Sequence, residues 1–316
     1  MSNFRTIVPI KPVEKRLSYE DNYFLMGSCF SENIGHYLKT YQFKQMVNPF
    51  GIIFNLASLS RLTQRIVDLE HFTTADIVEN QGVWSCFEAH SNQNSQSSQL
   101  LLERLNQQLT AANDWLKNAT IFVLTVGTSW VYRHLAYNKI VANCHKMPAN
   151  KFEKVLLNPA ENLFYLNQII LKLKAFNPNL KIMLTVSPVR HIKDGFFENN
   201  VSKAHLLSAI DQVNETNVFY FPSYEIMQDD LRDYRFYAED MLHPNEIAIK
   251  YIWQKFSDNY FDASTIQTMT TVEAINKMKQ HRPFIENSAA HLEFLKDLDQ
   301  KVKRMQSKYI WFFRNH

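Results

Sequence analysis

Short, continuously apolar runs alternate along this chain with longer stretches in which apolar residues recur every three or four positions. The apolar runs predict buried strands at 23–26, 120–126, 180–186 and 218–221. The longer stretches predict helices at 31–43, 56–69, 100–116, 161–176, 201–213 and 245–260. Continuous rather than alternating apolar strands, separated by helices, are typical of a parallel sheet that is covered on both faces. This pattern predicts a three-layer α/β/α sandwich with a mainly parallel sheet over residues 22–258, with a β-hairpin around Gly82.

The last part of the chain, residues 264–316, has a different pattern. A helix is predicted at 271–280, and Pro283 breaks it. A second helix follows whose apolar residues form one stripe: Leu292, Leu295, Leu298, Val302, Met305, Tyr309 and Phe312. The expected structure is a C-terminal helical hairpin packed on the core, and the alternative is a homodimer formed through these helices.

Composition excludes several classes of protein. Apolar residues make up 46% of the chain and charged residues 21%, which suits a folded protein with a sizeable core. The net charge of +3 provides no basic field for nucleic acid. The chain begins without the apolar segment of a signal peptide, no run is long enough to cross a bilayer, and three cysteines do not make a disulfide framework. The sequence therefore predicts a soluble cytoplasmic protein with neither nucleic acid nor membrane as a partner.

Polar residues follow three of the predicted strands at the point where each strand ends. Gly27, Ser28 and Cys29 follow the first strand, Gly127 to Ser129 follow the second, and Ser187 to Arg190 follow the third. The carboxyl ends of parallel strands share one edge of a sheet, and ligands bind beyond that edge. We therefore expect these loops to converge.

Two segments about 210 residues apart suggest chemistry at this edge. Asp240-x-x-His243 can place a carboxylate oxygen on Nδ1 of the imidazole, leaving Nε2 as a base. The alternative is that Asp240 caps the helix that follows and His243 faces solvent. Cys29 lies at the predicted start of a helix, where free N–H groups and the helix dipole stabilise a thiolate. Its alternative is a small, inert buried cysteine, and Ser28 is the alternative nucleophile.

Several short motifs occur in an order that resembles the GSCFA family, which is placed with the SGNH/GDSL hydrolases. They are Gly27-Ser28-Cys29-Phe30-Ser31, Asn48-Pro49-Phe50-Gly51, Gly127-Thr128-Ser129-Trp130, Asn143-Cys144-His145-Lys146 and Asp240-Met241-Leu242-His243-Pro244. The resemblance covers residues 22–258 and implies an SGNH-hydrolase-like fold. In the related hydrolases the third residue of the first motif is a nucleophilic serine. That position falls on Cys29 here, and Ser28 replaces an aspartate.

The resemblance also implies an oxyanion hole. Related hydrolases use the N–H of the nucleophile, a glycine N–H from the second block and an asparagine from the third. Gly51 matches that glycine, Ser129 stands after Gly127 in place of the asparagine, and Asn48 is the substitute donor. Gly127 is expected to bind the oxyanion or the substrate as well, and outside this set Arg190 and His145 are expected to bind substrate.

These residues predict an acyl-ester hydrolase or acyl transferase that works through a covalent acyl-enzyme on an acylated sugar or similar small substrate. Cys29, or else Ser28, attacks, His243 moves the proton and Asp240 orients it. No cofactor is required, and no metal site is expected because the cysteines and histidines lack ligand spacing. The alternative is a catalytically silent ligand- or carbohydrate-binding protein, favoured by the two serine replacements.

Overall fold

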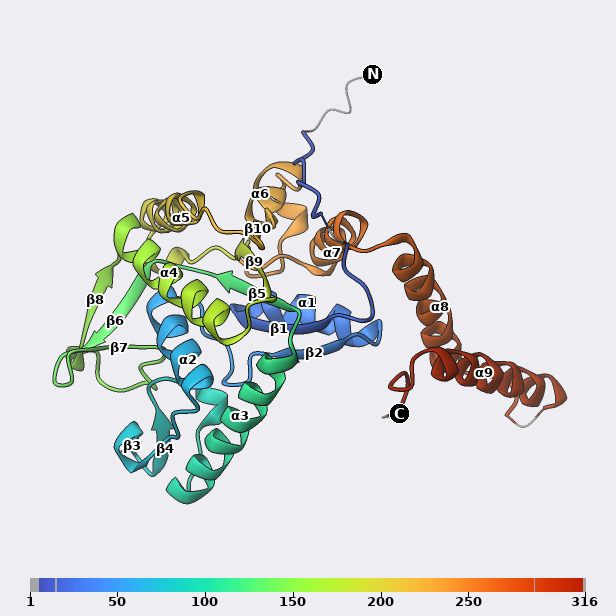
Figure 1. The fold of residues 1–316 in the computed structure, drawn as a ribbon, viewed down its shortest axis with the longest axis horizontal. Helices are drawn as coiled ribbons and strands as arrows, with labels where there is room; N and C mark the ends of the chain where they lie inside the picture. Colours follow the sequence, from blue (N-terminus) through green and yellow to red (C-terminus); the bar gives the residue numbers. More distant parts are fainter. Residues whose placement is uncertain (1–5, 15, 287, 315–316) are drawn as a thin grey trace.

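A five-stranded, fully parallel sheet in the order β10, β9, β5, β1, β2 lies at the centre of the protein (Figure 1). The computed structural model describes residues 6–14, 16–286 and 288–314. The strands of this sheet are β1 (Asn22–Gly27), β2 (Lys44–Val47), β5 (Ile121–Val126), β9 (Lys181–Val186) and β10 (Val218–Tyr220). The predicted parallel sheet is therefore confirmed.

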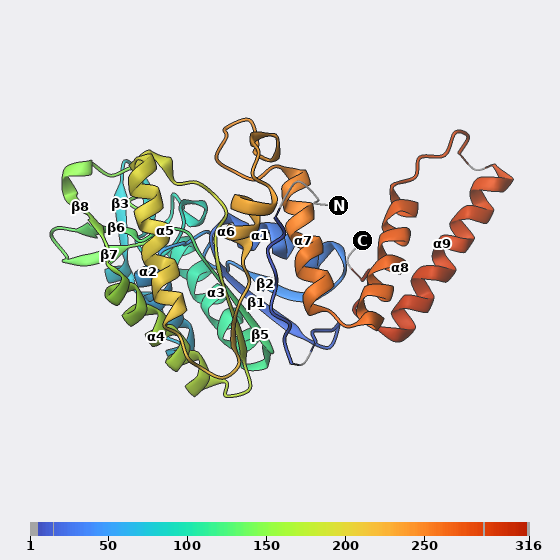
Figure 2. The same ribbon diagram turned by 90° about the horizontal axis from the view of Figure 1, so that it is seen from above.

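Helices cover both faces of the sheet. Successive side chains of each strand point in opposite directions, so each strand packs against both layers of helices. In β1, Phe24 and Met26 face one layer of helices, and Tyr23 and Leu25 face the other. The first layer contains α2 (Leu56–Asp68), α3 (Ser98–Asn118), α4 (Pro159–Phe176) and α5 (Phe196–Asp211). The opposite layer contains α1 (Cys29–Thr40) and α7 (Glu246–Tyr260) (Figure 2). The short α6 (Ser223–Glu225) follows β10. The three-layer α/β/α prediction holds.

Two antiparallel additions lie outside the central sheet. The predicted hairpin around Gly82 is formed by β3 (Ile77–Asn80) and β4 (Val83–Cys86). A three-stranded sheet that the pattern did not predict joins β7 (Lys139–Val141), β6 (Trp130–His134) and β8 (Phe152–Leu156). Single turns of 3-10 helix lie at Thr74–Asp76, Ser91–Gln93, Ala149–Lys151, Ile192–Asp194 and Tyr234–Phe236, and a π-helical turn lies at Ile226–Asp230.

The first predicted helix was placed wrongly at both ends. It begins at Cys29 rather than at residue 31, because the Ser28 hydroxyl caps it by accepting a hydrogen bond from the N–H of Phe30 (3.2 Å). It ends at Thr40 rather than at residue 43. Gln42 takes a left-handed conformation (φ 68°) that turns the chain into β2, which pairs with β1.

The C-terminal segment forms α8 (Ala263–Gln280) and α9 (Ala289–Lys308), which project beyond α7 (Figure 2). The first of these helices starts eight residues before the predicted residue 271, because Asp262 caps it by accepting from the N–H of Thr265 (2.7 Å). Met269, Val272 and Ile275 of α8 belong to the core of the α1 and α7 layer.

The predicted apolar stripe packs on the core only in its second half, where Leu298, Val302, Met305, Tyr309 and Phe312 belong to or contact the core of the α1 and α7 layer. Leu292 and Leu295 of α9 are exposed, and among the described residues of this helix only Met305 is buried. The helix ends at Lys308, so Phe312 lies in the turn that follows and is fully buried. The indole N–H of Trp311 donates to the carbonyl of Gln42 (3.0 Å), which fastens this tail to the loop after α1.

No helix among the described residues has both the length and the apolar character needed to span a lipid bilayer.

Candidate active site

The turn between β1 and α1 is fixed by close backbone contacts. Gly27 has a φ of 142°, and a Cβ atom at this position would lie 2.1 Å from the carbonyl oxygen of Thr125. The N–H of Ser28 donates to that same oxygen (3.0 Å), and the N–H of Gly27 donates to Oδ1 of Asn48 (2.9 Å). Only glycine allows β1 and β5 to approach in this way. The turn therefore holds Ser28 and Cys29 at the carboxyl edge of the sheet.

Ser28 and Cys29 have different environments. Ser28 is 2% exposed, and its hydroxyl oxygen caps α1. Cys29 occupies the first position of the helix and is partly exposed. Of the two candidate nucleophiles, Cys29 has the side chain that a substrate can reach.

Opposing effects act on the thiol. Burial and the Glu32 carboxylate raise the pKa of Cys29, whereas the N–H groups of Cys29 and Phe30 and the ammonium of Lys203 act to lower it. The helix start thus stabilises the thiolate in the expected direction, but burial outweighs it. Burial raises the pKa of the other two free thiols to about 12 for Cys86 and about 11 for Cys144.

Lys203 is a charged residue of this site that the sequence reasoning missed. It comes from α5, is 1% exposed, and donates from Nζ to the carbonyl of Ser187 at the end of β9 (2.7 Å). Burial lowers its pKa to about 7, and the charge of Cys29 acts in the opposite direction. The buried face of α5 carries Asn199, Ser202 and Lys203 beside Leu206 and Ala209, so no apolar stripe in the sequence marks Lys203 as buried.

Another titratable residue of the site is His191, which interacts electrostatically with both Lys203 and His243. Burial, together with the positive charges of Lys203 and His243, lowers its pKa to about 3. Its Nε2 atom is buried without a hydrogen-bond partner among the described residues. A Cβ on Gly127 would lie 3.1 Å from this nitrogen, so Gly127 leaves room for the imidazole.

The Asp240–His243 pair has the geometry of an oriented base. Oδ2 of Asp240 lies 2.6 Å from Nδ1 of His243, and Oδ1 accepts from the N–H groups of Leu242 (2.9 Å) and His243 (3.0 Å). The hydrogen bonds from the His243 N–H and ring lower the pKa of Asp240 to about 2. The carboxylate therefore fixes the tautomer with a proton on Nδ1 and leaves Nε2 as an acceptor.

The alternative role for Asp240, a cap on the next helix, is not observed. Asn245 caps α7 instead, by accepting from the N–H of Ala248 (3.0 Å). Asp240 and His243 have side chains that are 46% and 49% exposed. No hydrogen bond joins His243 to Cys29 within the described part of the chain. Arg190 also bonds to this loop. Its backbone N–H donates to the carbonyl of Leu242 (3.2 Å), and its Nη1 donates to the carbonyl of Met241 (3.3 Å).

Most of the predicted oxyanion donors already have partners. The N–H of Gly51 donates to the carbonyl of Asn48 (2.8 Å), and the N–H of Gly127 donates to that of Phe54 (2.7 Å). Ser129 is fully buried, and its hydroxyl donates to the carbonyl of Ser202 (2.9 Å). In contrast to the expectation from the sequence, these three residues support neighbouring loops and offer no free donor.

Asn48 is the exception among these donors. It is 8% exposed, and its Oδ1 accepts from Gly27 at the turn itself. Its Nδ2 is buried and has no partner among the described residues. An amide that is fixed by one atom and free at the other is suited to stabilise an oxyanion next to Cys29.

His145 lies apart from these groups. It is buried, its Nε2 lies 2.7 Å from the carbonyl of Cys86, and its ring packs against Phe87. Burial lowers its pKa. The described residues show no contact between His145 and Cys29, Lys203 or His243, so the structure places it with the β3–β4 hairpin.

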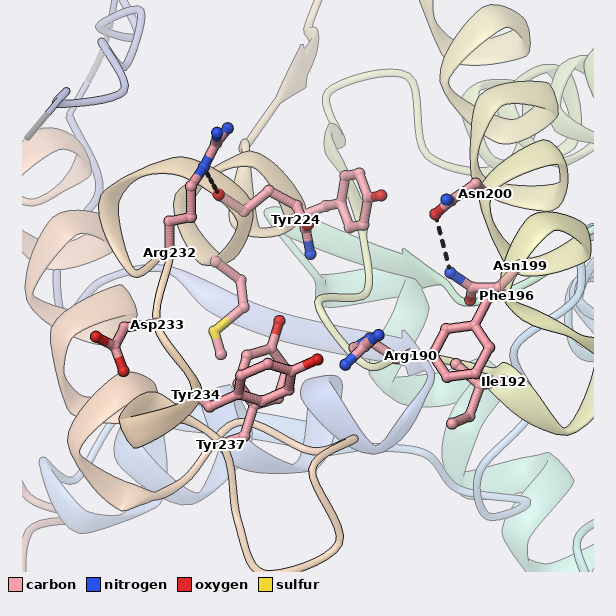
Figure 3. A pocket seen from close by; sticks show the side chains of 12 residues that line it. Arg190, Ile192, Phe196, Asn199, Asn200, Tyr224, Arg232, Asp233, Tyr234 and Tyr237 are labelled. Carbon is pink, nitrogen blue, oxygen red and sulfur yellow. Dashed lines mark hydrogen bonds between the residues drawn. The ribbon is translucent and has the colours of Figure 1, made fainter.

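A pocket of about 320 Å³ adjoins the Asp240–His243 loop on the side of Arg190 (Figure 3). Figure 3 shows Arg190 between Phe196 on one side and Tyr234 and Tyr237 on the other. The described residues contain no group of three or more histidine, cysteine or acidic side chains that could hold a metal ion.

Comparison with known proteins identifies a family and two similar folds. The model of the GSCFA family matches residues 22–256, and that of the GSCFA domain protein, C-terminal domain, matches residues 272–314. One similar solved structure is a carbohydrate esterase family 3 protein from Talaromyces cellulolyticus, at 8% identity and a TM-score of 0.37, covering 79% of this chain and 98% of that one.

A second similar structure is an acetyl xylan esterase from the rumen bacterium Butyrivibrio proteoclasticus, at 9% identity and a TM-score of 0.41. The alignment covers 80% of this chain and 64% of that one, so the chain spans less than two thirds of the bacterial esterase. No curated protein matches the sequence.

Proposed function

Because the chain belongs to the GSCFA family, whose motifs form the site described above, we propose that it is an acyl-ester hydrolase or acyl transferase with Cys29 as nucleophile. The observation that carries this proposal is the Asp240–His243 hydrogen bond (2.6 Å), which leaves Nε2 as an acceptor. A histidine oriented in this way is the base that a thiol needs in order to attack at neutral pH. The substrate we propose is an acylated sugar or similar small ester.

The reaction proceeds in two steps. The proton of the Cys29 thiol moves to Nε2 of His243, the sulfur bonds to the acyl carbon, and the carbon–oxygen bond to the alcohol breaks as His243 returns the proton to the leaving oxygen. Water or a second alcohol then attacks the thioester, again with His243 as base, and the thiol is restored. The N–H of Cys29 and Nδ2 of Asn48 stabilise the oxyanion.

Lys203 has a supporting role in this scheme. Its ammonium lowers the pKa of Cys29, and it is held in place by the carbonyl of Ser187. A positive charge that is buried near the thiol stabilises the thiolate without contacting the substrate.

The test is acylation by p-nitrophenyl acetate, followed by intact mass and peptide mapping. We expect one acetyl group on Cys29 and none on the Cys29→Ala variant. The matched control is Cys144→Ala, which removes another partly exposed free thiol and leaves acylation unchanged. Equal acylation of the wild type and Cys29→Ala would remove Cys29 from its role.

A second function, a ligand-binding protein without turnover, is favoured by one observation. Among the described residues Cys29 and His243 share no hydrogen bond, and the pKa of the thiol is raised rather than lowered. If the protein only binds a ligand, p-nitrophenyl acetate should form no acyl-enzyme. The rate of Cys29 alkylation should then be the same in the wild type and in His243→Ala.

A further inference from the structure

The pocket beside the Asp240–His243 loop contains a guanidinium that no carboxylate of the described residues neutralises. Arg190 forms no ion pair with any of these residues, and its side chain makes one hydrogen bond to them, to the carbonyl of Met241 (3.3 Å). The other charged residues of the pocket have partners. Arg232 pairs with Asp229, and Asp233 accepts from the N–H of Arg235 (2.9 Å).

Aromatic rings surround this guanidinium. Its central carbon lies 5.5 Å from the ring centre of Phe196, 5.9 Å from that of Tyr234 and 5.7 Å from that of Tyr237. These rings attract the cation without accepting a hydrogen bond from it, so among the described residues the side chain of Arg190 donates only to Met241 and its other N–H groups are available to a ligand. Tyr224 also lines this pocket (Figure 3).

Three hydrogen bonds join the pocket to His191 and to the Asp240–His243 loop. Asn199, which lines it, accepts through Oδ1 from the N–H of His191 (2.8 Å). Arg190 itself holds the carbonyls of Met241 and Leu242, which precede His243. A ligand that engages Arg190 therefore lies beside the loop that carries the base of the proposed reaction.

We propose that this pocket binds the part of the substrate that carries a carboxylate on a ring. The free N–H groups of Arg190 bind the carboxylate in a bidentate manner, and the ring of the ligand packs against the aromatic side chains that line the pocket. A volume of about 320 Å³ holds one such ring. The claim that the bound acid is part of the substrate rests on the proposed function. The claim that the pocket binds such an acid does not require any turnover.

Two pairs of probes test the inference by calorimetry or ligand-observed NMR on the full chain. Benzoate is compared with benzamide, and methyl glucuronoside with methyl glucoside. We expect one acid or both to bind about tenfold more tightly than the neutral partner, as one charge-assisted bidentate contact allows. Preference for benzoate identifies an aromatic acid, and preference for the glucuronoside identifies a sugar acid.

Variants of the pocket residues test whether the preference for acids arises from Arg190. Arg190→Gln should abolish it, and Arg190→Lys should weaken it, because lysine keeps the charge without the planar fork. Arg232→Gln is the matched control, since it removes an arginine of the same pocket that is already paired. Tyr234→Ala, at an exposed position, should weaken all four probes and serves if Arg190→Gln does not fold.

Equal affinity for the acid and its neutral partner in both pairs, or an acid preference that survives Arg190→Gln, would overturn the inference. The two proposals fail separately. A protein that is acylated on Cys29 but has no acid preference loses this inference alone. A protein that binds the acids through Arg190 but is never acylated keeps it and loses the proposed function.

Discussion

The two halves of the candidate active site are built in opposite ways. The Gly27–Cys29 turn is buried between β1 and β5, and its backbone is tied to Thr125 and Asn48. The Asp240–His243 loop presents side chains that are nearly half exposed, and its hydrogen bonds are mainly its own. The nucleophile therefore depends on the fold, whereas the base depends on one carboxylate.

The charges follow the same division. Lys203 and His191 lie on the buried side, and burial lowers the pKa of each, to about 7 and about 3. On the exposed side, hydrogen bonds rather than burial set the pKa of Asp240 at about 2. Substitutions in the buried half should therefore change stability and activity together, and those in the exposed half should change activity alone.

Gly27→Ala should have the largest effect, because it disturbs the packing of β1 against β5 and the position of Cys29 at the same time. The added Cβ would lie 2.1 Å from the Thr125 oxygen at a φ of 142°. We expect a loss of about 3 kcal/mol or more in the free energy of unfolding, measured by urea denaturation. Gly82→Ala is the control, because Gly82 also has a positive φ (78°) but no atom within 4 Å of the new Cβ, and it should cost only about 1 kcal/mol. Similar losses in both variants would show that the turn is not rigid.

His243→Ala should have the next largest effect, and only on the chemistry. Removal of a general base slows an acyl transfer by roughly 10²–10⁴-fold. The free energy of unfolding should stay within about 0.5 kcal/mol of the wild type, because the side chain is exposed. Hydrolysis of p-nitrophenyl acetate and urea denaturation give the two values. The control is His36→Ala, which removes an exposed histidine of α1. A large loss of stability in His243→Ala would contradict the division between the halves.

The parts of the site that the sequence predicted are those whose geometry is local. Gly27 lies between a strand and a helix, and Asp240 lies three residues before His243, so chain geometry alone brings each group together. The parallel sheet was predictable for a similar reason, because continuous apolar runs such as β5 and β9 exclude a half-exposed sheet.

The parts that the sequence did not predict depend on which way a side chain points in the folded protein. Ser129 follows a strand as expected, but α5 brings Ser202 against it and takes up its hydroxyl. Lys203, the next residue of that helix, is instead buried near Cys29. The Arg190 pocket draws its rings from α5, α6 and the segment around Tyr234, and no local pattern joins these segments.

His191→Gln should have a smaller effect, and one that depends on pH. The folded protein holds His191 neutral down to a pH of about 3, whereas the unfolded chain takes up the proton near the ordinary value of 6.5. Its contribution to stability is therefore fully present above pH 6.5 and is lost as the pH falls toward 3, by up to about 1.4 kcal/mol per pH unit. Urea denaturation across this range should show a shallower slope in His191→Gln. An unchanged slope would mean that His191 is not buried as a neutral ring.

Asp240→Asn should have a small effect on stability. The lowered pKa means that the carboxylate stabilises the folded protein above pH 3.8, and that this contribution is lost as the pH falls to about 2. Because the side chain is 46% exposed, solvent screens the interaction, and we expect a change of less than about 1 kcal/mol in the free energy of unfolding at pH 7. This window lies mostly below that of His191, so denaturation between pH 6.5 and 4 reports on the buried half and denaturation below pH 3 reports on the exposed half.

The same substitution should still change the tautomer of His243. The N–H groups of Leu242 and His243 require an oxygen at the position of Oδ1, so the amide nitrogen of the introduced asparagine must take the place of Oδ2, next to Nδ1 of the imidazole. Nδ1 then has to accept, the ring proton moves to Nε2, and the base is lost. Imidazole ¹⁵N shifts should show Nδ1–H in the wild type and Nε2–H in the variant, with hydrolysis reduced. An unchanged tautomer together with unchanged hydrolysis would show that Asp240 does not orient the histidine.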